Sequence, residues 1–198
     1  MNLALFDFDG TITEQDTYTQ FLFYVTPKRR LIMTLLLASP FIALYKLRLL
    51  KPSKTRPLLS KIVFWNRSVA DITRLARSFS EQYLPNVIRA EVLKKIEWHK
   101  AQGDEVYVVS ASLDLYLSRW CRSQGIKWVC SELETKNNKL TGRYVSGDCS
   151  LENKVIAIKR KVNLIDFKTI YAYGDTAEDL PMLALAHEKY LNWKRITD

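Results

Sequence analysis

The segment from Thr17 to Ala70 contains no aspartate and no glutamate, although the chain has 21 acidic residues. It does contain ten of the chain's 30 lysines and arginines, which leaves 20 basic residues against the 21 acidic residues elsewhere. The ten are Lys28, Arg29, Arg30, Lys46, Arg48, Lys51, Lys54, Arg56, Lys61 and Arg67. The net charge of +9 is therefore concentrated in this one segment, and the rest of the chain is close to neutral.

Cysteine and histidine are also scarce. Cys121, Cys130 and Cys149 show no C-x-x-C spacing, which argues against a zinc or thiol-redox site and favours reduced thiols in a cytoplasmic protein. His99 and His187 lie too far apart in the sequence to suggest a metal pair, so we expect both to pack against other side chains or lie at the surface. No basic residue precedes the first apolar run and an acidic residue interrupts it, so no signal peptide is expected.

Two carboxylates follow the apolar run that opens the chain. The run from Leu3 to Phe8 is typical of a strand buried on both faces, and Asp7 and Asp9 would project together at its end, with Gly10 allowing a turn and Thr11 beside them. Burying two unpaired carboxylates would cost on the order of several kcal/mol, so the pair needs a cation or a shared proton. A hard divalent metal is the simplest partner. The alternative is a surface turn in which Asp-x-Asp-Gly only solvates the strand end.

Short apolar runs alternate with helical patterns in the second half of the chain. The expected strands cover residues 3–8, 105–109, 127–130, 169–173 and 190–191. This alternation predicts an α/β fold with a Rossmann-like, mostly parallel sheet flanked by helices. In such a sheet ligands bind at the carboxyl ends of the strands, so we expect Asp7, Asp9, Ser110 and Asp175 to converge on one site.

No strand-like alternation is visible between residues 14 and 100, which predicts an all-helical cap inserted after the first strand. The expected boundaries are 14–85 for the cap domain, and 1–13 with 86–198 for the catalytic core. Further expected elements are a basic turn at 51–57, helices at about 58–66, 69–83 and 85–102, and a hairpin at 139–145.

The converging side chains support metal-assisted phosphoryl chemistry. Mg²⁺ held by Asp7, Asp175 and the main-chain carbonyl of Asp9 would have hard oxygen ligands and would shield the charge of a phosphoryl group. Asp7 could then attack phosphorus, while Asp9 could protonate the leaving alcohol and later deprotonate water.

Three other polar residues could assist this chemistry. Ser110 offers a hydroxyl to a phosphoryl oxygen, Lys154 offers a compact positive charge, and Asp179 could hold Lys154 or a metal-bound water. Each has a structural alternative. Ser110 could cap the following helix, Lys154 could be a surface lysine, and Asp175 and Asp179 could be a cap and a first-turn acid of a helix.

In this order, the series Asp7-Phe-Asp-Gly-Thr11, Ser110, Lys154 and Gly174-Asp175-Thr-Ala-Glu-Asp179 resembles the four motifs of the haloacid dehalogenase (HAD) superfamily. It is most similar to subfamily IB, the phosphoserine-phosphatase-like enzymes with a helical cap. The resemblance implies Asp7 as nucleophile, Asp9 as acid/base and Asp7, Asp9 and Asp175 as Mg²⁺ ligands. The residues it suggests for phosphate or substrate binding are Thr11, Asp16, Ser110, Ala111 and Lys154. Asp16 occupies the position where phosphoserine phosphatases carry an acidic residue that faces the substrate.

The chain departs from the phosphoserine phosphatase pattern at two motifs. Thr176 and Glu178 replace a glycine and an asparagine of the last motif, and Ser110-Ala-Ser112 replaces Ser-Gly-Gly. These departures argue against phosphoserine as the substrate. The apolar and basic cap is more similar to that of the phosphatidylglycerophosphatase C type within the same subfamily.

The leading hypothesis is a Mg²⁺-dependent phosphomonoesterase that forms an aspartyl-phosphate and acts on a lipid phosphate such as phosphatidylglycerophosphate. The alternatives are a phosphatase for a phosphoserine-like or sugar phosphate, a phosphotransferase, and a non-catalytic HAD-like module whose basic cap docks on an anionic membrane. Nucleic acid is not expected, because the basic residues alternate with aliphatic side chains. The expected location is the cytoplasm, with peripheral contact at the cytoplasmic face of the membrane.

The apolar stretch from Leu31 to Tyr45 has two interpretations. As a helix it would be roughly 22 Å long, shorter than a hydrocarbon core of about 30 Å, so it should not span a membrane. It is either the core of the cap or an interfacial segment held by apolar insertion and by the basic residues that flank it.

Overall fold

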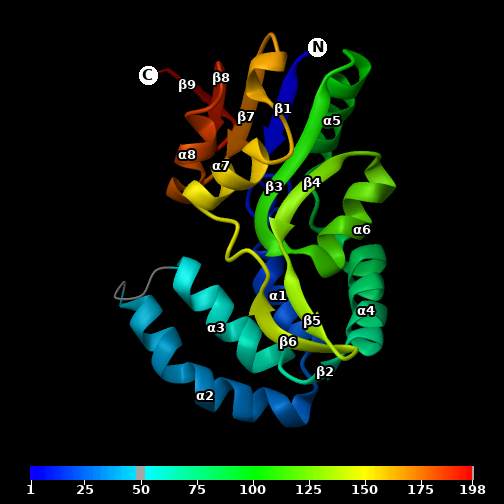
Figure 1. Ribbon diagram of the computed structural model, residues 1–198, viewed down its shortest axis with the longest axis vertical. Helices are drawn as coiled ribbons and strands as arrows, with labels where there is room; N and C mark the ends of the chain where they lie inside the picture. The colour runs from blue at the N-terminus through cyan, green and yellow to red at the C-terminus, as the bar shows by residue number, and fades with distance from the viewer. Residues whose placement is uncertain (48–51, 198) are drawn as a thin grey trace.

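The computed structural model describes residues 1–47 and 52–197. Its centre is a six-stranded sheet in the order β4-β3-β1-β7-β8-β9 (Figure 1). The strands are β1 (Leu3–Phe6), β3 (Glu105–Leu113), β4 (Lys127–Ser131), β7 (Ile170–Gly174), β8 (Glu188–Leu191) and β9 (Lys194–Ile196). All neighbours pair in parallel except β8 and β9, so the predicted α/β fold with a mostly parallel sheet is confirmed. The antiparallel edge strand β9 was not predicted.

The central strand β1 is buried on both faces. Ala4 and Phe6 belong to one hydrophobic cluster, whereas Leu3 and Leu5 belong to another, as the alternation of side chains along a strand requires. Helices α5 (Ala90–Ala101) and α6 (Asp114–Gln124) contribute to the first cluster, and α7 (Glu152–Lys159) and α8 (Leu180–Leu183) contribute to the second. A strand covered on both faces has an unbroken apolar sequence, which explains the opening run of the chain.

We call residues 14–85 the insert and the remainder the core; this division into domains stays a prediction. The insert contains α1 (Thr17–Val25), α2 (Lys28–Lys46), α3 (Pro52–Phe64), β2 (Arg67–Ser68), α4 (Val69–Ser78), the π-helical turn η1 (Phe79–Tyr83) and the start of the 3₁₀ turn η2 (Leu84–Asn86). Helices α1, α2 and α3 lie at the end of the molecule opposite the two chain termini (Figure 1). Within residues 1–47 and 52–197, no helix combines the length and the apolar character needed to cross a bilayer.

The prediction of an all-helical insert is wrong at Arg67-Ser68. This short strand, β2, pairs with β6 (Lys139–Tyr144), which in turn pairs with β5 (Leu133–Lys136). The turn of the hairpin is Asn137-Asn138, whose φ angles are 50° and 58°. Two positive φ angles are what a tight two-residue hairpin turn requires, and asparagine tolerates them. The predicted hairpin at 139–145 is therefore wrong in position, because those residues form its second strand.

Helix α3 lies against the hairpin at Gly142. This glycine has a φ of +73°, and a Cβ atom on it would lie 2.6 Å from the Cα of Lys61. The insert and the hairpin therefore meet there backbone to backbone, at a distance that only glycine permits.

Two predicted boundaries in and after the insert are wrong. Helix α3 begins at Pro52, so the predicted basic turn at 51–57 is helical wherever it is described; residue 51 lies outside the described residues. Proline is well tolerated in the first turn of a helix, which explains this start. The helix expected from residue 85 begins only at Ala90, because the preceding segment pairs with residues 12–14 instead: Glu14 N donates to Val87 O and Arg89 N donates to Ile12 O.

Candidate active site

Asp7 lies directly after β1, at the carboxyl edge of the sheet. Its N–H donates to the carbonyl of Tyr173 at 2.9 Å, so the backbone continues the ladder with β7, and the residue is only 6% exposed. Gly10 follows with a φ of +80°, and a Cβ atom there would lie 2.1 Å from Oδ2 of Asp175. Glycine at this turn is therefore what lets the Asp175 carboxylate approach the segment that carries Asp7.

Lys154 extends from α7 into the same cluster and is 1% exposed. Its ammonium donates to Oδ1 of Asp7 and, at 2.6 Å, to Oδ1 of Asp179. A buried lysine is stable only when its charge is matched, and two carboxylates here raise its pKa despite the opposing effect of burial. The alternative of Lys154 as a surface lysine is excluded.

Asp179 organises the turn that follows β7. Its Oδ2 accepts hydrogen bonds from the backbone N–H groups of Asp175 and Thr176, both at 3.1 Å. Gly174 permits this arrangement, because a Cβ atom on it would lie 2.5 Å from the Cβ of Asp179. Burial alone would raise the pKa of Asp179, but Lys154 and these hydrogen bonds outweigh burial and lower it.

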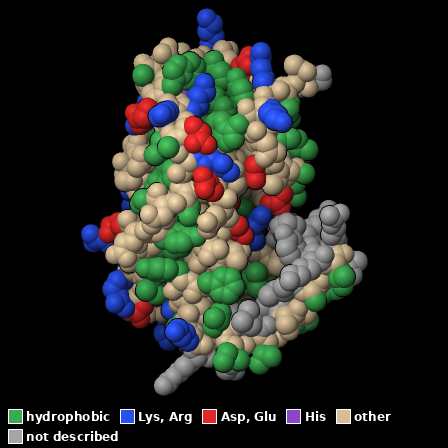
Figure 2. Space-filling view, turned by 180° about the vertical axis from the view of Figure 1, so that it is seen from behind, with side chains coloured by type: hydrophobic (Ala, Val, Ile, Leu, Met, Phe, Trp, Pro, Cys, Tyr) green, Lys and Arg blue, Asp and Glu red, His purple; other side chains and the backbone are tan. Residues whose placement is uncertain are grey.

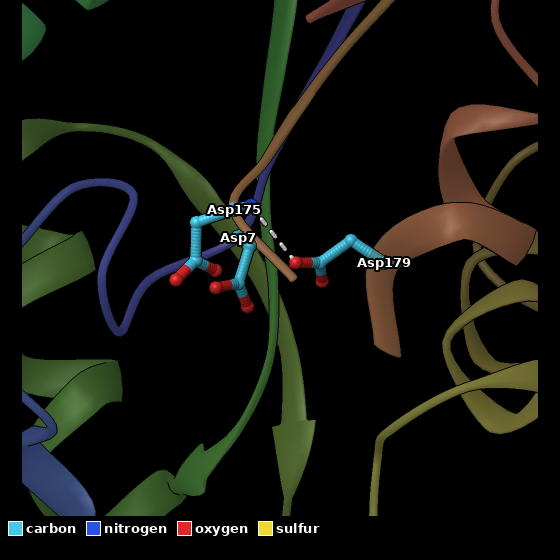
Figure 3. A group of neighbouring side chains, drawn as sticks. All are labelled: Asp7, Asp175 and Asp179. Atoms are coloured by element: carbon cyan, nitrogen blue, oxygen red, sulfur yellow. Dashed lines mark hydrogen bonds between the residues drawn. The ribbon is translucent and has the colours of Figure 1, made fainter. Parts of the chain in front are cut away.

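The carboxylates of Asp7, Asp175 and Asp179 form one group (Figure 3). One oxygen from each lies within 4.8 Å of the others, and Lys154 is the ammonium that contacts the group. Burial raises the pKa of Asp7 and the charge of Asp179 raises it further; burial and Asp179 also raise the pKa of Asp175 to about 6. Closely spaced carboxylates with excess negative charge are the donor set that hard divalent cations prefer, so these residues fit Mg²⁺.

Asp9 has a separate set of partners. Its Oδ1 accepts from the backbone N–H of Thr17 at 2.8 Å and from the Thr17 hydroxyl at 2.5 Å, and its Oδ2 accepts from the Ser112 hydroxyl. The Tyr116 hydroxyl donates to Ser112 Oγ at 2.7 Å and lies 3.0 Å from the Thr17 hydroxyl. Burial, and next the charge of Asp16, raise the pKa of Asp9 to about 6. A carboxyl group that titrates near neutral pH can both donate and accept a proton.

Ser110 is buried within β3, which continues to Leu113, beyond the predicted end at residue 109. A register shift against β4 lies between Ser110 and Leu113, and the Ser110 hydroxyl accepts from the backbone N–H of Ser112 at 3.1 Å. The residue before α6 is Leu113, so Ser110 does not cap that helix. The irregular strand end leaves Ser110 and Ala111 facing the same cavity as Asp7.

Two other predicted site residues are placed differently. Asp16 caps α1, where it accepts from the backbone N–H of Thr19 at 3.1 Å, and it also lines the cavity. Thr11 is buried but does not line the cavity, and its hydroxyl has no hydrogen-bond partner among the described residues.

A cavity of about 680 Å³ joins the core to the insert. Its floor, as we define it, consists of Asp7, Asp9, Ser110, Lys154 and Asp175. Its apolar wall consists of Leu22, Phe23, Leu31, Leu59 and Val63, which come from α1, α2 and α3. A phosphoryl group at the floor would therefore place its ester substituent against apolar side chains.

Sequence reasoning missed Arg56 and Glu178, which also line the cavity. Arg56 lies on α3 and donates to Asp148 at 3.0 Å and to Glu178 at 2.6 Å. The signal that could have found them is the departure at Glu178, since an acidic residue in place of an amide calls for a basic partner.

Comparison with known proteins agrees with this architecture. The family model described as haloacid dehalogenase-like hydrolase matches residues 4–184. Protein CicA of Caulobacter vibrioides is 31% identical over 196 residues, a match that covers 94% of this chain and 84% of CicA.

Two solved structures show the same fold. A protein of unknown function from Bordetella pertussis Tohama I is similar with a TM-score of 0.84 and 20% identity, over 96% of this chain and 89% of that one. A phospho-aspartyl intermediate analogue of phosphoserine phosphatase is similar with a TM-score of 0.62 and 19% identity, over 98% and 94% of the two chains. The predicted likeness to the phosphoserine phosphatase fold is thereby confirmed, while the likeness to the phosphatidylglycerophosphatase C type stays a prediction.

Proposed function

This chain belongs to the haloacid dehalogenase-like hydrolases, and from this membership we propose that it is a Mg²⁺-dependent phosphomonoesterase that works through an aspartyl-phosphate on Asp7. The observation that carries the proposal is the buried Asp7 carboxylate, held by Lys154 at the floor of the cavity and grouped with Asp175 and Asp179. Asp7 and Asp175 would hold the ion, with the main-chain carbonyl of Asp9 as a further ligand. When bound, Mg²⁺ would shield the negative charge of the phosphoryl oxygens from the attacking carboxylate.

The first half of the proposed reaction transfers the phosphoryl group to the protein. A carboxylate oxygen of Asp7 forms a bond to phosphorus as the bond from phosphorus to the ester oxygen breaks. Asp9 donates a proton to that leaving oxygen, so the product departs as an alcohol. Lys154 and Ser110 would bind the phosphoryl oxygens through the ammonium and the hydroxyl.

The second half releases phosphate. Asp9, now a carboxylate, takes a proton from water as that water attacks phosphorus, and the bond between phosphorus and Asp7 breaks. Inorganic phosphate leaves and both aspartates return to their starting states. Thr17 and Ser112 would keep Asp9 oriented during both steps, because they hold both of its oxygens.

The test is to trap the acyl phosphate chemically. Hydroxylamine added during turnover should displace phosphate from Asp7 and leave a hydroxamate, which mass spectrometry of a proteolytic digest would detect on the peptide that contains Asp7. The label should depend on both Mg²⁺ and a phosphomonoester. A label on another residue, or turnover of phosphomonoesters with no label, would refute the aspartyl-phosphate.

A lipid phosphate is the substrate class that the wall favours. Five apolar side chains face the cavity, and Leu31 among them lies on α2, whose other side is exposed. A small polar leaving group such as serine or a sugar would leave these side chains without apolar contacts, whereas an alkyl chain would cover them.

Helix α2 also presents a surface that suits an anionic bilayer. Ile32, Leu36 and Leu44 are 66%, 69% and 39% exposed and lie at intervals of four or eight residues, which places them on one face of the helix. Figure 2 shows hydrophobic side chains at the surface of the end of the molecule that carries the insert. Lys28 and Arg30, at the start of the helix, are exposed and basic. Apolar insertion plus about 1 kcal/mol per basic residue near an anionic surface would hold the insert at the membrane.

Vesicle cosedimentation tests this contact independently of catalysis. The protein should sediment with vesicles of phosphatidylglycerol and phosphatidylcholine more than with phosphatidylcholine alone. Lys28/Arg29/Arg30→Gln should weaken this binding while leaving the hydrolysis of a small soluble phosphoester unchanged. Equal sedimentation with both vesicle types, or with neither, would instead make α2 part of the core of the insert.

A further inference from the structure

Arg56 connects the insert to two separate segments of the core. Its Nη1 lies 3.0 Å from Oδ2 of Asp148, its Nη2 lies 2.6 Å from Oε2 of Glu178, and its side chain is 21% exposed. Each terminal nitrogen thus serves a different carboxylate. The planar guanidinium can span the two, whereas the single ammonium of lysine could approach only one at a time.

Glu178 and Asp148, the two partners of Arg56, lie in segments that carry residues of the floor or residues that hold the floor in place. Glu178 directly precedes Asp179, and Asp148 lies in the loop that leads into α7, the helix of Lys154. These two segments also contact each other, because the N–H of Leu151 donates to the carbonyl of Glu178 at 3.2 Å. One residue of the insert therefore braces the pieces of core that position Lys154 and Asp175.

The base of Arg56 is itself fixed in place. The Tyr18 hydroxyl donates to the carbonyl of Arg56 at 2.7 Å. The Ser60 hydroxyl, one turn further along α3, lies 3.0 Å from the Tyr18 hydroxyl and 2.9 Å from that of Tyr144 on β6. These bonds tie α3 to α1 and to the hairpin, so the Arg56 side chain starts from a rigid position.

The positive charge of Arg56 is outweighed by the negative charges around it. One guanidinium faces two carboxylates, and Asp148 and Glu178 raise the pKa of Arg56 even though burial opposes this. Arg56 therefore presents no unmatched positive charge to the cavity. A leaving group that carried a carboxylate would have to displace Asp148 or Glu178 in order to pair with it.

We propose that Arg56 is a positioning residue whose pairing with Glu178 and Asp148 holds the floor in working geometry and makes the cavity select phosphoesters with an uncharged leaving group. This inference rests on the proposed phosphatase function for its kinetic consequences. It also accounts for Glu178, the acidic residue found where phosphoserine phosphatases carry an asparagine. A residue that pairs with Arg56 in this way leaves the Arg56 guanidinium unavailable to the carboxylate of an amino acid.

The pairing can be tested without any activity measurement. Arg56→Met, Glu178→Gln and the double variant form a thermodynamic cycle in thermal unfolding. The two single variants' losses in Tm should together exceed the loss in the double variant by about 2–4 °C, the shift that 1 kcal/mol produces in a domain of this size. Lys54→Met removes an exposed cation from the same helix and should leave Tm unchanged. Additive losses would overturn the pairing.

The kinetic test compares hexyl phosphate with its ω-carboxy derivative, two esters that differ only in a terminal carboxylate. Arg56→Met should lower kcat by about 10- to 100-fold on both esters with little change in KM, because it misplaces the floor rather than removing a substrate contact. Arg56→Lys should recover little, and Lys54→Met should match the unaltered enzyme.

The selectivity test uses Glu178→Gln/Asp148→Asn, which leaves Arg56 without its partners. The unaltered enzyme should prefer hexyl phosphate, and the double variant should shift the ratio of kcat/KM for the two esters toward the carboxylated one by about tenfold or more, equivalent to one charge contact of 1.4 kcal/mol. An unchanged ratio would refute the selectivity. A rise in KM for the carboxylated ester alone in Arg56→Met would make Arg56 a substrate ligand and overturn the positioning role. If the unaltered enzyme hydrolyses neither ester, the proposed substrate class fails, while the thermal cycle still decides the pairing.

Discussion

The floor and the wall of the cavity are built by opposite means. The floor consists of polar and charged residues of the core, mostly buried, that lie at or near strand ends or near the start of a helix, and Lys154 offsets part of the negative charge of the carboxylates. The wall consists of apolar side chains from three helices of a segment that has no acidic residue. Under the proposed function, the floor would set the chemistry and the wall would set which phosphoester is accepted. Substitutions should separate these two roles.

The largest effect should come from Asp7→Asn. The amide cannot attack phosphorus and is a weaker metal ligand, so phosphate release should fall on the order of 10⁴-fold or more on every phosphoester tested. The fold should remain intact, because the substitution replaces a buried carboxyl group, whose pKa is raised by burial, with a neutral amide of the same size. Circular dichroism would check the fold and a phosphate-release assay the rate. Rapid turnover by the purified variant would contradict the mechanism.

Asp9→Asn should have the next largest effect. Loss of the proton donor and acceptor should slow turnover by about 10² to 10⁴. Because the Asp9 carboxylate bonds to Thr17 and Ser112 rather than to the metal group, Mg²⁺ affinity measured by calorimetry should change little. A large loss of Mg²⁺ affinity would place the Asp9 side chain among the metal ligands.

A wall substitution should alter binding and leave the rate alone. Leu59→Ala removes apolar contact of about 1 kcal/mol, so KM for hexyl phosphate should rise roughly 3- to 10-fold while kcat stays the same. Methyl phosphate, which is too short to reach the wall, should be hydrolysed unchanged. Leu180→Ala, an exposed leucine outside the cavity, is the matched control. A fall in kcat on both esters would show that the wall also supports the floor.

The smallest effect on activity should come from His99→Gln, at the opposite end of the sheet. His99 is fully buried, with Nδ1 2.9 Å from Asp104 and Nε2 3.0 Å from the Tyr173 hydroxyl. Burial lowers its pKa below the ordinary 6.5, so the unfolded chain binds a proton more readily than the folded one. The neutral His99 imidazole therefore contributes its full stabilisation of the fold above pH 6.5, and this contribution is lost as the pH falls from 6.5 toward the lowered pKa.

The measurement is the free energy of unfolding between pH 7 and pH 5. Relative to His99→Gln, the unaltered protein should lose stability on acidification by no more than about 1.4 kcal/mol per pH unit, the limit for one proton. Parallel pH profiles for the two proteins would show that His99 does not titrate in this range. Phosphate release at pH 7 should be nearly equal in both.

The convergence of Asp7, Asp9, Ser110 and Asp175 on one cavity could be predicted because each lies at or near the end of an apolar run that forms a strand. Asp7, Ser110 and Asp175 come at or near strand ends, and the rule for parallel sheets brings such ends together. The burial of Lys154 could not be predicted from the residues, since nothing in an ordinary helix pattern indicates it. Its position depends on α7 packing against the sheet, which is a tertiary effect.

The contacts of Arg56 could not be predicted in this way. Asp148 and Glu178 are 92 and 122 residues away from it, so no local periodicity connects them. The two-residue strand β2 was invisible for a related reason: its pairing with β6 is decided by the fold, and two residues are too few for an alternating pattern. Short elements and distant ion pairs are determined by tertiary packing, whereas long apolar runs can be recognised in the sequence itself.

The backbone contact at Gly142 limits how the insert can move. A side-chain contact could slide or rearrange, but a peptide chain pressed against another has no such freedom, so α3 can turn about this point more easily than it can shift past it. Lys61 marks the pivot, and Arg56 lies five residues away, or roughly 7.5 Å along the helix. A small rotation would therefore part Arg56 from its carboxylates while the far end of α3 stayed seated on the hairpin. Such a rotation would open the cavity at Arg56 first, while the contact at Gly142 stayed in place.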